Sequence, residues 1–216
     1  MRVLLDEHLC DVKVDSVGAA IAAASALAQE KGRLIVEVLV DGQSWNGGQT
    51  DEELSSARAN EVRLTSVEPT DLVCRTFEDA SLALADADAL QQAAAELLQA
   101  NQTTPAMEKL NEALSIWSAV RQAVVMGHEV MGGALDLSKG QSADRDAQAS
   151  MAQIINQLNA QLRAIRAALE LGDTVALSDT LLYDLPPVVS EWRGMLIDLQ
   201  AQLQGRKARI GLEEIR

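Results

Sequence analysis

The chain has 216 residues and a formal net charge of −14, with 48 % hydrophobic and only 2 % aromatic residues. A protein this acidic is repelled by nucleic acid and by anionic membrane surfaces, so neither is expected as a partner. Because rings are scarce, leucine, alanine, valine and isoleucine must fill the core, which suits close helix packing. The length allows one or two domains.

Three features indicate a soluble, cytoplasmic protein. The two cysteines, Cys10 and Cys74, have no close pairing in sequence, as is typical of free thiols in a reduced compartment. The first 15 residues carry acidic groups at positions 6, 7 and 11, so they lack the apolar core of a signal peptide. The uncharged run 17–29 is too short and too rich in alanine to span a bilayer.

The first 68 residues predict a small α/β unit. Apolar or alternating patterns predict strands, and acidic residues after residue 50 open a short helix. The strongest helix signal is Ser16, a capping residue before an alanine-rich stretch that Gly32 ends. The expected strands are 1–5, 9–14, 33–40 and 61–67, and the expected helices are 17–31 and 51–59.

Strand, strand, helix, strand, strand is the resulting order, and it resembles the β-grasp arrangement of ubiquitin-like domains, in which a sheet wraps around one helix. The resemblance covers residues 1–68 and rests on element order. It implies one sheet with the helix 17–31 packed on it. A ferredoxin-like half or a plain α+β sandwich are the alternatives, and the alanines of the helix suit close approach to a sheet in each case.

The remainder predicts an antiparallel four-helix bundle over residues 69–205, followed by a mixed-charge tail, 206–216. Apolar residues recur at three- and four-residue steps in four long stretches joined by short polar segments. Pro69 marks the boundary, Thr70 or Asp71 is the expected first cap, and Thr104 with Pro105 is a strong start signal for the second helix. The third and fourth helices are expected at 147–171 and 173–204.

The junction between these last two helices combines Gly172, which can close a helix in the left-handed conformation, with Asp173, which can cap the next one. Pro186 and Pro187 then interrupt the final apolar stripe. The segment is therefore either one kinked helix or two helices. The apolar phase continues across the prolines, which favours a single kinked helix.

No stretch carries a catalytic, cofactor-binding or metal-binding signature. His8 and Cys10 are adjacent enough to share a metal, but further ligands are remote in sequence, and Cys74 with His128 would form a nucleophile pair only if the fold joined them. We therefore expect no enzyme activity, cofactor or metal. The candidate partner-binding residues are the tryptophans and the residues at the Pro-Pro break, which are Trp45, Trp117, Leu185, Pro186 and Trp192. Core packing is the simpler interpretation of Trp117 and Trp192.

The resulting hypothesis is a non-catalytic protein-interaction module, adaptor- or chaperone-like, that binds another protein or forms a homodimer. Helix number, the leucine, alanine and glutamine content and the Gly172-Asp173 junction resemble the helical bundles of bacterial flagellar and secretion chaperones, which implies binding of helical client segments. The alternative is a ligand-binding protein or enzyme whose site is assembled from residues distant in sequence. A deep pocket lined by convergent polar groups would distinguish it.

Overall fold

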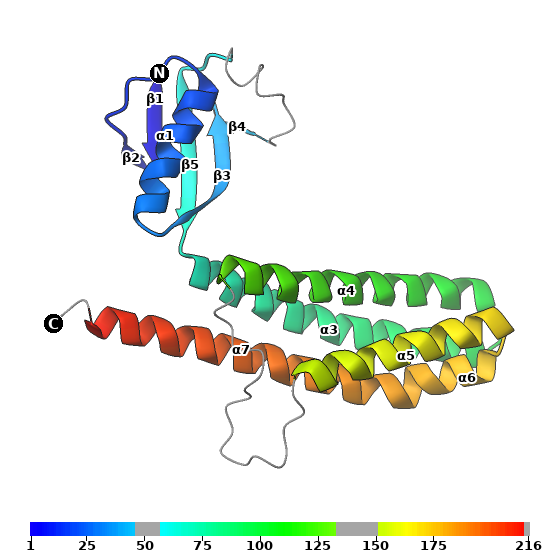
Figure 1. Cartoon of the computed structure of the whole chain (residues 1–216). Helices are drawn as coiled ribbons and strands as arrows, with labels where there is room; N and C mark the ends of the chain where they lie inside the picture. Colours follow the sequence, from blue (N-terminus) through cyan, green and yellow to red (C-terminus); the bar gives the residue numbers. More distant parts are fainter. Residues whose placement is uncertain (46–56, 133–150, 214–216) are drawn as a thin grey trace. The chain divides into compact units, whose positions relative to one another are not determined.

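The protein has an α+β fold, in which a small mixed sheet with one helix is followed by long helices (Figure 1). In this computed structural model the described backbone covers residues 1–45, 57–132 and 151–213, and side chains are described there except at 151–152 and 208–213. The chain divides into two compact units, Met1–Leu72 and Val73–Arg216.

The described part of the first unit contains β1 (Arg2–Leu5), β2 (His8–Leu9), α1 (Val17–Glu30), β3 (Leu34–Val40), β4 (Gln43–Ser44) and β5 (Glu61–Val67). Its strands form one sheet in the order β2-β1-β5-β3-β4. β1 pairs with β5 in parallel, whereas β1–β2, β3–β4 and β3–β5 are antiparallel. Parallel pairing of the first and last strands requires the crossover that α1 provides.

One face of this sheet packs against α1. The helix presents its small residues at four-residue steps, so its backbone can approach the sheet closely. Ser16 caps α1 as expected, since its Oγ accepts a hydrogen bond from the Ala19 N–H at 3.3 Å, and Gly32 follows with a positive φ of 64°. The core residues are Val3, Leu5, Val17, Ala20, Ala24, Ala28, Val62 and Leu64.

The predicted strand 9–14 is wrong in extent, because β2 ends at Leu9. Asp6 and Glu7 both have positive φ and form the tight turn that returns the chain beside β1. The residues after β2 keep their alternation, and Cys10, Val12 and Val14 pack against the core without joining the sheet ladder. Of the predicted helix 51–59, residues 51–56 lie outside the described residues, and residues 57–59 are not helical.

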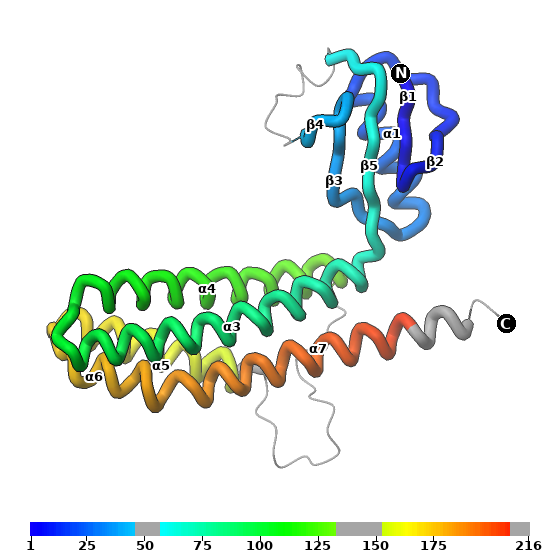
Figure 2. Tube along the Cα trace, turned by 180° about the vertical axis from the view of Figure 1, so that it is seen from behind, coloured from blue at the N-terminus to red at the C-terminus, as the bar shows by residue number. Residues whose placement is uncertain are grey.

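The described helices of the second unit are α3 (Pro69–Gln99, whose first turn belongs to the first unit), α4 (Thr103–Val130), α5 (Met151–Leu171), α6 (Thr174–Asp179), the π-helical turn η1 (Thr180–Asp184) and α7 (Leu185–Glu213). Figures 1 and 2 show α3, α4, α5 and the α6–η1–α7 segment lying alongside one another. Two of the predicted starts are wrong by one or two residues, since α3 begins at Pro69 and Gln102 precedes α4.

The final helical segment runs without a break from Thr174 to Glu213, so the prolines do not separate two helices by a turn. The capping predicted at its start is confirmed: Asp173 accepts hydrogen bonds from Val175 and Ala176, and Gly172 has a φ of 66°. Because α7 reaches Glu213, most of the expected tail 206–216 is helical.

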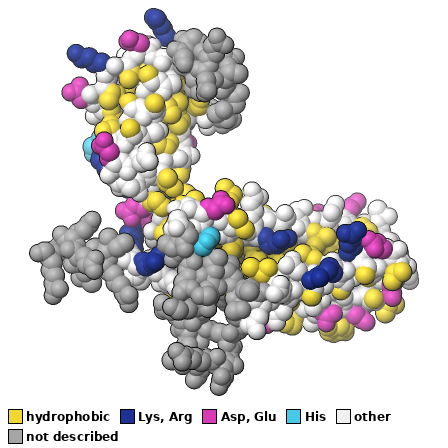
Figure 3. All heavy atoms as spheres, in the orientation of Figure 1, with side chains coloured by type: hydrophobic (Ala, Val, Ile, Leu, Met, Phe, Trp, Pro, Cys, Tyr) yellow, Lys and Arg dark blue, Asp and Glu magenta, His cyan; other side chains and the backbone are white. Residues whose placement is uncertain are grey.

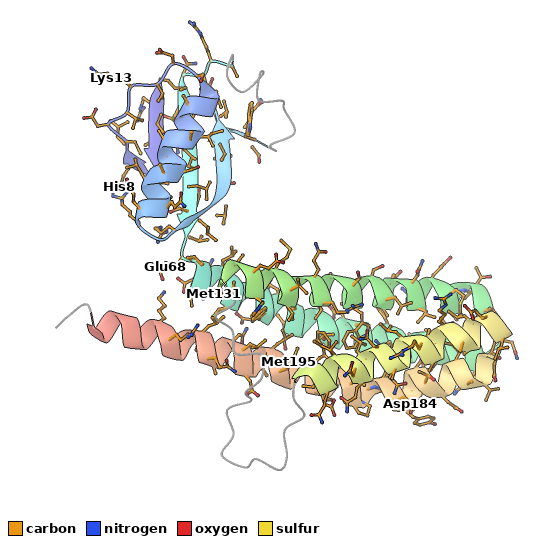
Figure 4. The ribbon with its side chains drawn as sticks, viewed as in Figure 1. His8, Lys13, Glu68, Met131, Asp184 and Met195 are labelled. Carbon is orange, nitrogen blue, oxygen red and sulfur yellow. The ribbon has the colours of Figure 1, made fainter. Side chains whose placement is uncertain are left out.

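Side chains of all these helices build a second hydrophobic core. Two hydrogen bonds show that α3 runs opposite to the last segment: Gln99 Nε2 donates to Ser178 Oγ at 3.3 Å, and Gln200 Nε2 donates to the Cys74 carbonyl at 2.9 Å. Figure 4 shows Met195, which is buried, on α7 inside this unit, and Asp184 on its outer surface. None of the helices in the described residues is long and apolar enough to cross a bilayer.

Candidate functional site

The candidate site is a pocket of about 450 Å³ in the helical unit, assembled from three helices. α4 supplies most of its wall, α5 contributes Ile155, and α7 contributes Trp192. This volume falls in the range of about 300–1,000 Å³ typical of ligand pockets. The α4 residues that line it are Ser118, Arg121, Gln122, Val124 and Val125.

Helical spacing explains how α4 builds this wall. Ser118, Arg121, Gln122 and Val125 follow one another at steps of three, one and three residues, so they share one face of the helix. Val124 belongs to the neighbouring buried face and is 4 % exposed. The pocket is thus polar along the outer side of α4 and apolar toward the core.

Trp192 anchors the apolar side of the pocket. It is 1 % exposed and packs edge-to-face against Trp117, with ring centroids 5.6 Å apart and an interplanar angle of 85°. This geometry is the one that aromatic pairs favour. The indole N–H groups of both tryptophans are buried and have no hydrogen-bond partner among the described residues. The aromatic pair therefore fixes α4 against α7 at the pocket.

Among the described residues that line the pocket, Arg121 is the only basic one. It is exposed and forms no ion pair with another described residue. Its guanidinium is suited to bind a carboxylate. The pocket can therefore hold an apolar group beside a negative one.

Exposed apolar side chains continue from the pocket along α4. Val125 is 58 % exposed, Met126 is 53 % exposed, and Val130 is 39 % exposed. Figure 3 shows that apolar side chains lie open among charged ones on the visible face of the helical unit. Single exposed apolar residues are ordinary, but neighbouring ones beside a concavity are typical of binding surfaces.

A second polar feature lies across the core on α3. Gln91 is 1 % exposed, and neither atom of its amide has a partner among the described residues. Asp88, one turn earlier, has a buried Oδ1 without a partner. Burial raises the pKa of the Asp88 carboxyl, and the Arg193 charge and the Gln92 hydrogen bond only partly oppose this. A buried polar atom without a partner costs free energy, so these groups reduce the stability of this part of α3.

The five residues predicted from the sequence to bind a partner differ in how deeply they are buried. Trp117, Leu185 and Trp192 are core residues with 1–2 % exposure, so they offer a partner very little surface. Pro186 is half-buried. Trp45 is half-buried in the first unit, where its backbone N–H donates to the Val38 carbonyl at 2.8 Å. Of the five, the structure brings Trp117 and Trp192 together, and only Trp192 lines the pocket.

Sequence reasoning missed Arg121, Gln122 and Val125. The available signal was the pair of adjacent apolar residues, Val125 and Met126, on the polar side of an amphipathic helix. Among the described residues, no group of three or more histidine, cysteine or acidic side chains is arranged to hold a metal ion. Cys10 and Cys74 are half-buried and are not joined in a disulfide.

The comparisons with known proteins add one finding. Residues 87–195 match the model of a family described as a domain of unknown function, DUF8042, and the chain belongs to this family. The match begins in α3 and ends in α7, so it includes each described residue that lines the pocket. No curated protein and no solved structure matches the chain.

Proposed function

We propose that the chain is a non-catalytic protein-interaction module, adaptor- or chaperone-like, which binds another protein or a second copy of itself. The observation that supports this function is the exposed apolar surface of Val125 and Met126 beside the pocket at Trp192. Such a surface is stabilised when a partner removes it from water. Because the net charge is −14, we propose a protein partner in the cytoplasm, and not nucleic acid or an anionic membrane.

We also propose a specific architecture for each unit, a β-grasp domain followed by an antiparallel four-helix bundle. The strand order β2-β1-β5-β3-β4, with β1 parallel to β5 and α1 on one face, supports a β-grasp assignment for the first unit. The antiparallel run of α3 against α6–η1–α7 supports a four-helix bundle, with α6, η1 and α7 as its fourth helix. A bundle that binds client segments is what the resemblance to flagellar and secretion chaperones implies.

Affinity capture from the native host tests the function. Tagged protein, expressed together with an untagged copy, is recovered at several salt concentrations, and Val125→Asp is compared with Leu82→Asp. Leu82 is 61 % exposed on α3 and does not line the pocket, so it is a matched control. We expect a protein that the wild type and Leu82→Asp retain and Val125→Asp loses. Recovery of neither another protein nor the untagged copy would contradict the proposal.

A second candidate function is binding of a small ligand. The pocket draws its lining from three helices far apart in sequence and has Ser118, Arg121 and Gln122 on one side. An apolar carboxylic acid matches this combination of apolar wall and arginine. Decanoate is a suitable probe: we expect it to raise the melting temperature of the wild type and not of Arg121→Gln. An equal rise for both would exclude Arg121 from binding.

A further inference from the structure

One face of α4 carries a charge pattern that is complementary to itself. Arg121, Val125 and Glu129 are spaced four residues apart and lie in one row along the helix. All three are exposed, with Val125 at 58 %. Neither Arg121 nor Glu129 forms an ion pair with another described residue. The row thus presents an unpaired positive charge, an apolar centre and an unpaired negative charge.

This row matches a second copy of the same row in antiparallel orientation. A two-fold axis through Val125 places residues that are equally distant from Val125 opposite one another. Arg121 of each copy then faces Glu129 of the other, which gives two reciprocal ion pairs. Val125 and the neighbouring Met126 each meet their own counterpart near the axis, so the exposed apolar side chains are covered.

The pocket supports the same arrangement. Arg121 and Val125 are both lining residues, so a copy placed along this row covers the pocket mouth as well as Met126. We infer that α4 is the homodimer interface of this protein, formed by antiparallel α4–α4 pairing with Val125 at the axis and Arg121 against Glu129 of the second copy. The inference rests on the proposed function, and it names a second copy of the chain as the protein that is bound.

The size of the face sets the expected affinity. One helix pair buries less than the standard interface of about 1,600 Å². The ion pairs are exposed and screened by salt, so they contribute more to orientation than to affinity. We therefore expect a monomer–dimer equilibrium in the micromolar range that weakens as salt increases.

Charge reversal of the full-length protein, followed by sedimentation equilibrium, tests this interface. Arg121→Glu places two like-charge pairs at the interface, and we expect it to raise the dimer Kd about tenfold or more; Glu129→Arg should do the same. The double variant Arg121→Glu with Glu129→Arg restores both pairs in reverse, so its Kd should return to within about threefold of the wild type.

Lys109→Glu is the matched control. It makes the same change of net charge on the same helix, and Lys109 lies three turns from the proposed row, paired with Glu112 at 2.9 Å. We expect the dimer Kd of this variant to equal that of the wild type. Circular dichroism establishes that each variant retains its helices, and recovery of the dimer in the double variant excludes misfolding as the cause of dissociation.

Three outcomes would overturn the inference: a wild-type monomer up to high micromolar concentration, a dimer insensitive to Arg121→Glu, or a double variant that stays dissociated. The second and third leave self-association through another surface intact, and the affinity capture described above still measures the broader interaction function independently. Failure of the α4 interface is therefore distinguishable from failure of the proposed function.

Discussion

Gly127 of α4 lies so close to side chains of α3 that there is no room for a Cβ atom. A Cβ at this position of α4 would lie 2.8 Å from Cζ of Phe77, a fully buried residue of α3, and 3.1 Å from Cγ1 of Val73. Overpacking of this kind costs about 1–3 kcal/mol. The better helix propensity of alanine returns up to about 1 kcal/mol. Gly127 therefore permits the close contact between α3 and α4.

We expect Gly127→Ala to lower the free energy of unfolding of the helical unit by up to about 2 kcal/mol, the difference between these two effects. Gly194→Ala on α7 is the control, because a Cβ there meets nothing within 4 Å. The higher helix propensity of alanine alone should raise the free energy of unfolding of Gly194→Ala by about 0.5–1 kcal/mol. Urea denaturation measures both changes, and stabilisation by Gly127→Ala would show that the Phe77 ring moves without cost.

Asp6 links the first turn of the chain to the last strand of the sheet. Its Oδ1 accepts the Ser66 N–H at 2.7 Å, and its Oδ2 accepts the Ser66 hydroxyl at 2.6 Å. Burial alone would raise the pKa of this carboxyl, but the two Ser66 hydrogen bonds and the charges of Arg33 and Lys31 together lower it. Arg33 also donates to the Ser66 hydroxyl and carbonyl, at 2.7 Å each.

The lowered pKa makes the sheet sensitive to acid. The Asp6 contribution is fully present above the pKa of an unfolded aspartate, about 3.9, and disappears as the pH falls through the lower pKa of the folded state. We expect Asp6→Asn to be less stable than the wild type at neutral pH and the difference to shrink below about pH 4. Amide signals of β5 in urea titrations measure this, and a pH-independent difference would contradict it.

At the scale of elements, the π turn η1 explains why the apolar stripe survives two prolines. Leu185 donates its N–H to the carbonyl of Thr180, five residues earlier, so one turn contains an extra residue. Leu177, Leu181, Leu185 and Val189 are buried at three successive four-residue steps, which would drift off one face at 3.6 residues per turn, and the extra residue offsets this drift. Pro186 and Pro187 follow inside the continuous helical segment, to which they supply no N–H group.

We expect Pro186→Ala combined with Pro187→Ala to keep the π turn, because the buried leucines fix its register. The variant should raise the free energy of unfolding by about 1–3 kcal/mol, since two N–H groups return to a continuous helix. Chemical denaturation gives the energy, and hydrogen exchange at residues 185–189 locates it. A loss of stability would show instead that the prolines are needed to stiffen this turn.

The sequence predicted best those elements for which the apolar periodicity and the capping residues indicate the same boundaries. Glu61–Val67 was predicted with its exact bounds because alternation there coincides with pairing on both sides, and the cap at Asp173 was predicted because its chemistry is local. The predicted strand 9–14 was wrong because alternating apolar residues indicate burial but not backbone hydrogen bonding. Val12 and Val14 pack against the core without pairing to a strand.

The pocket was not predictable for a different reason. Its lining residues on α4, α5 and α7 are up to 74 residues apart, from Ser118 to Trp192, and nothing local in the sequence specifies which helix faces meet. The aromatic pair illustrates this limit. Apolar spacing placed Trp117 and Trp192 each on a stripe, but only the packing of α4 on α7 brings their rings to 5.6 Å.

At the scale of the whole molecule, the two units differ in the size of their cores. Among the described residues, the buried core of the first unit consists of eight side chains, three of them alanines. The core of the second unit contains both buried tryptophans and most of the buried leucines. Because stability rises with the apolar area that folding buries, the second unit should be considerably more stable than the first.

Unfolding of the full chain should therefore occur in two steps, with the sheet unit first. Trp45→Phe makes this measurable, because the remaining tryptophans, Trp117 and Trp192, both lie in the second core. In this variant we expect β5 amide signals to disappear at a lower urea concentration than that at which tryptophan fluorescence changes. Coincident transitions would mean that the two cores unfold as one cooperative unit, and that the smaller core draws stability from the helices through the continuous segment from β5 into α3.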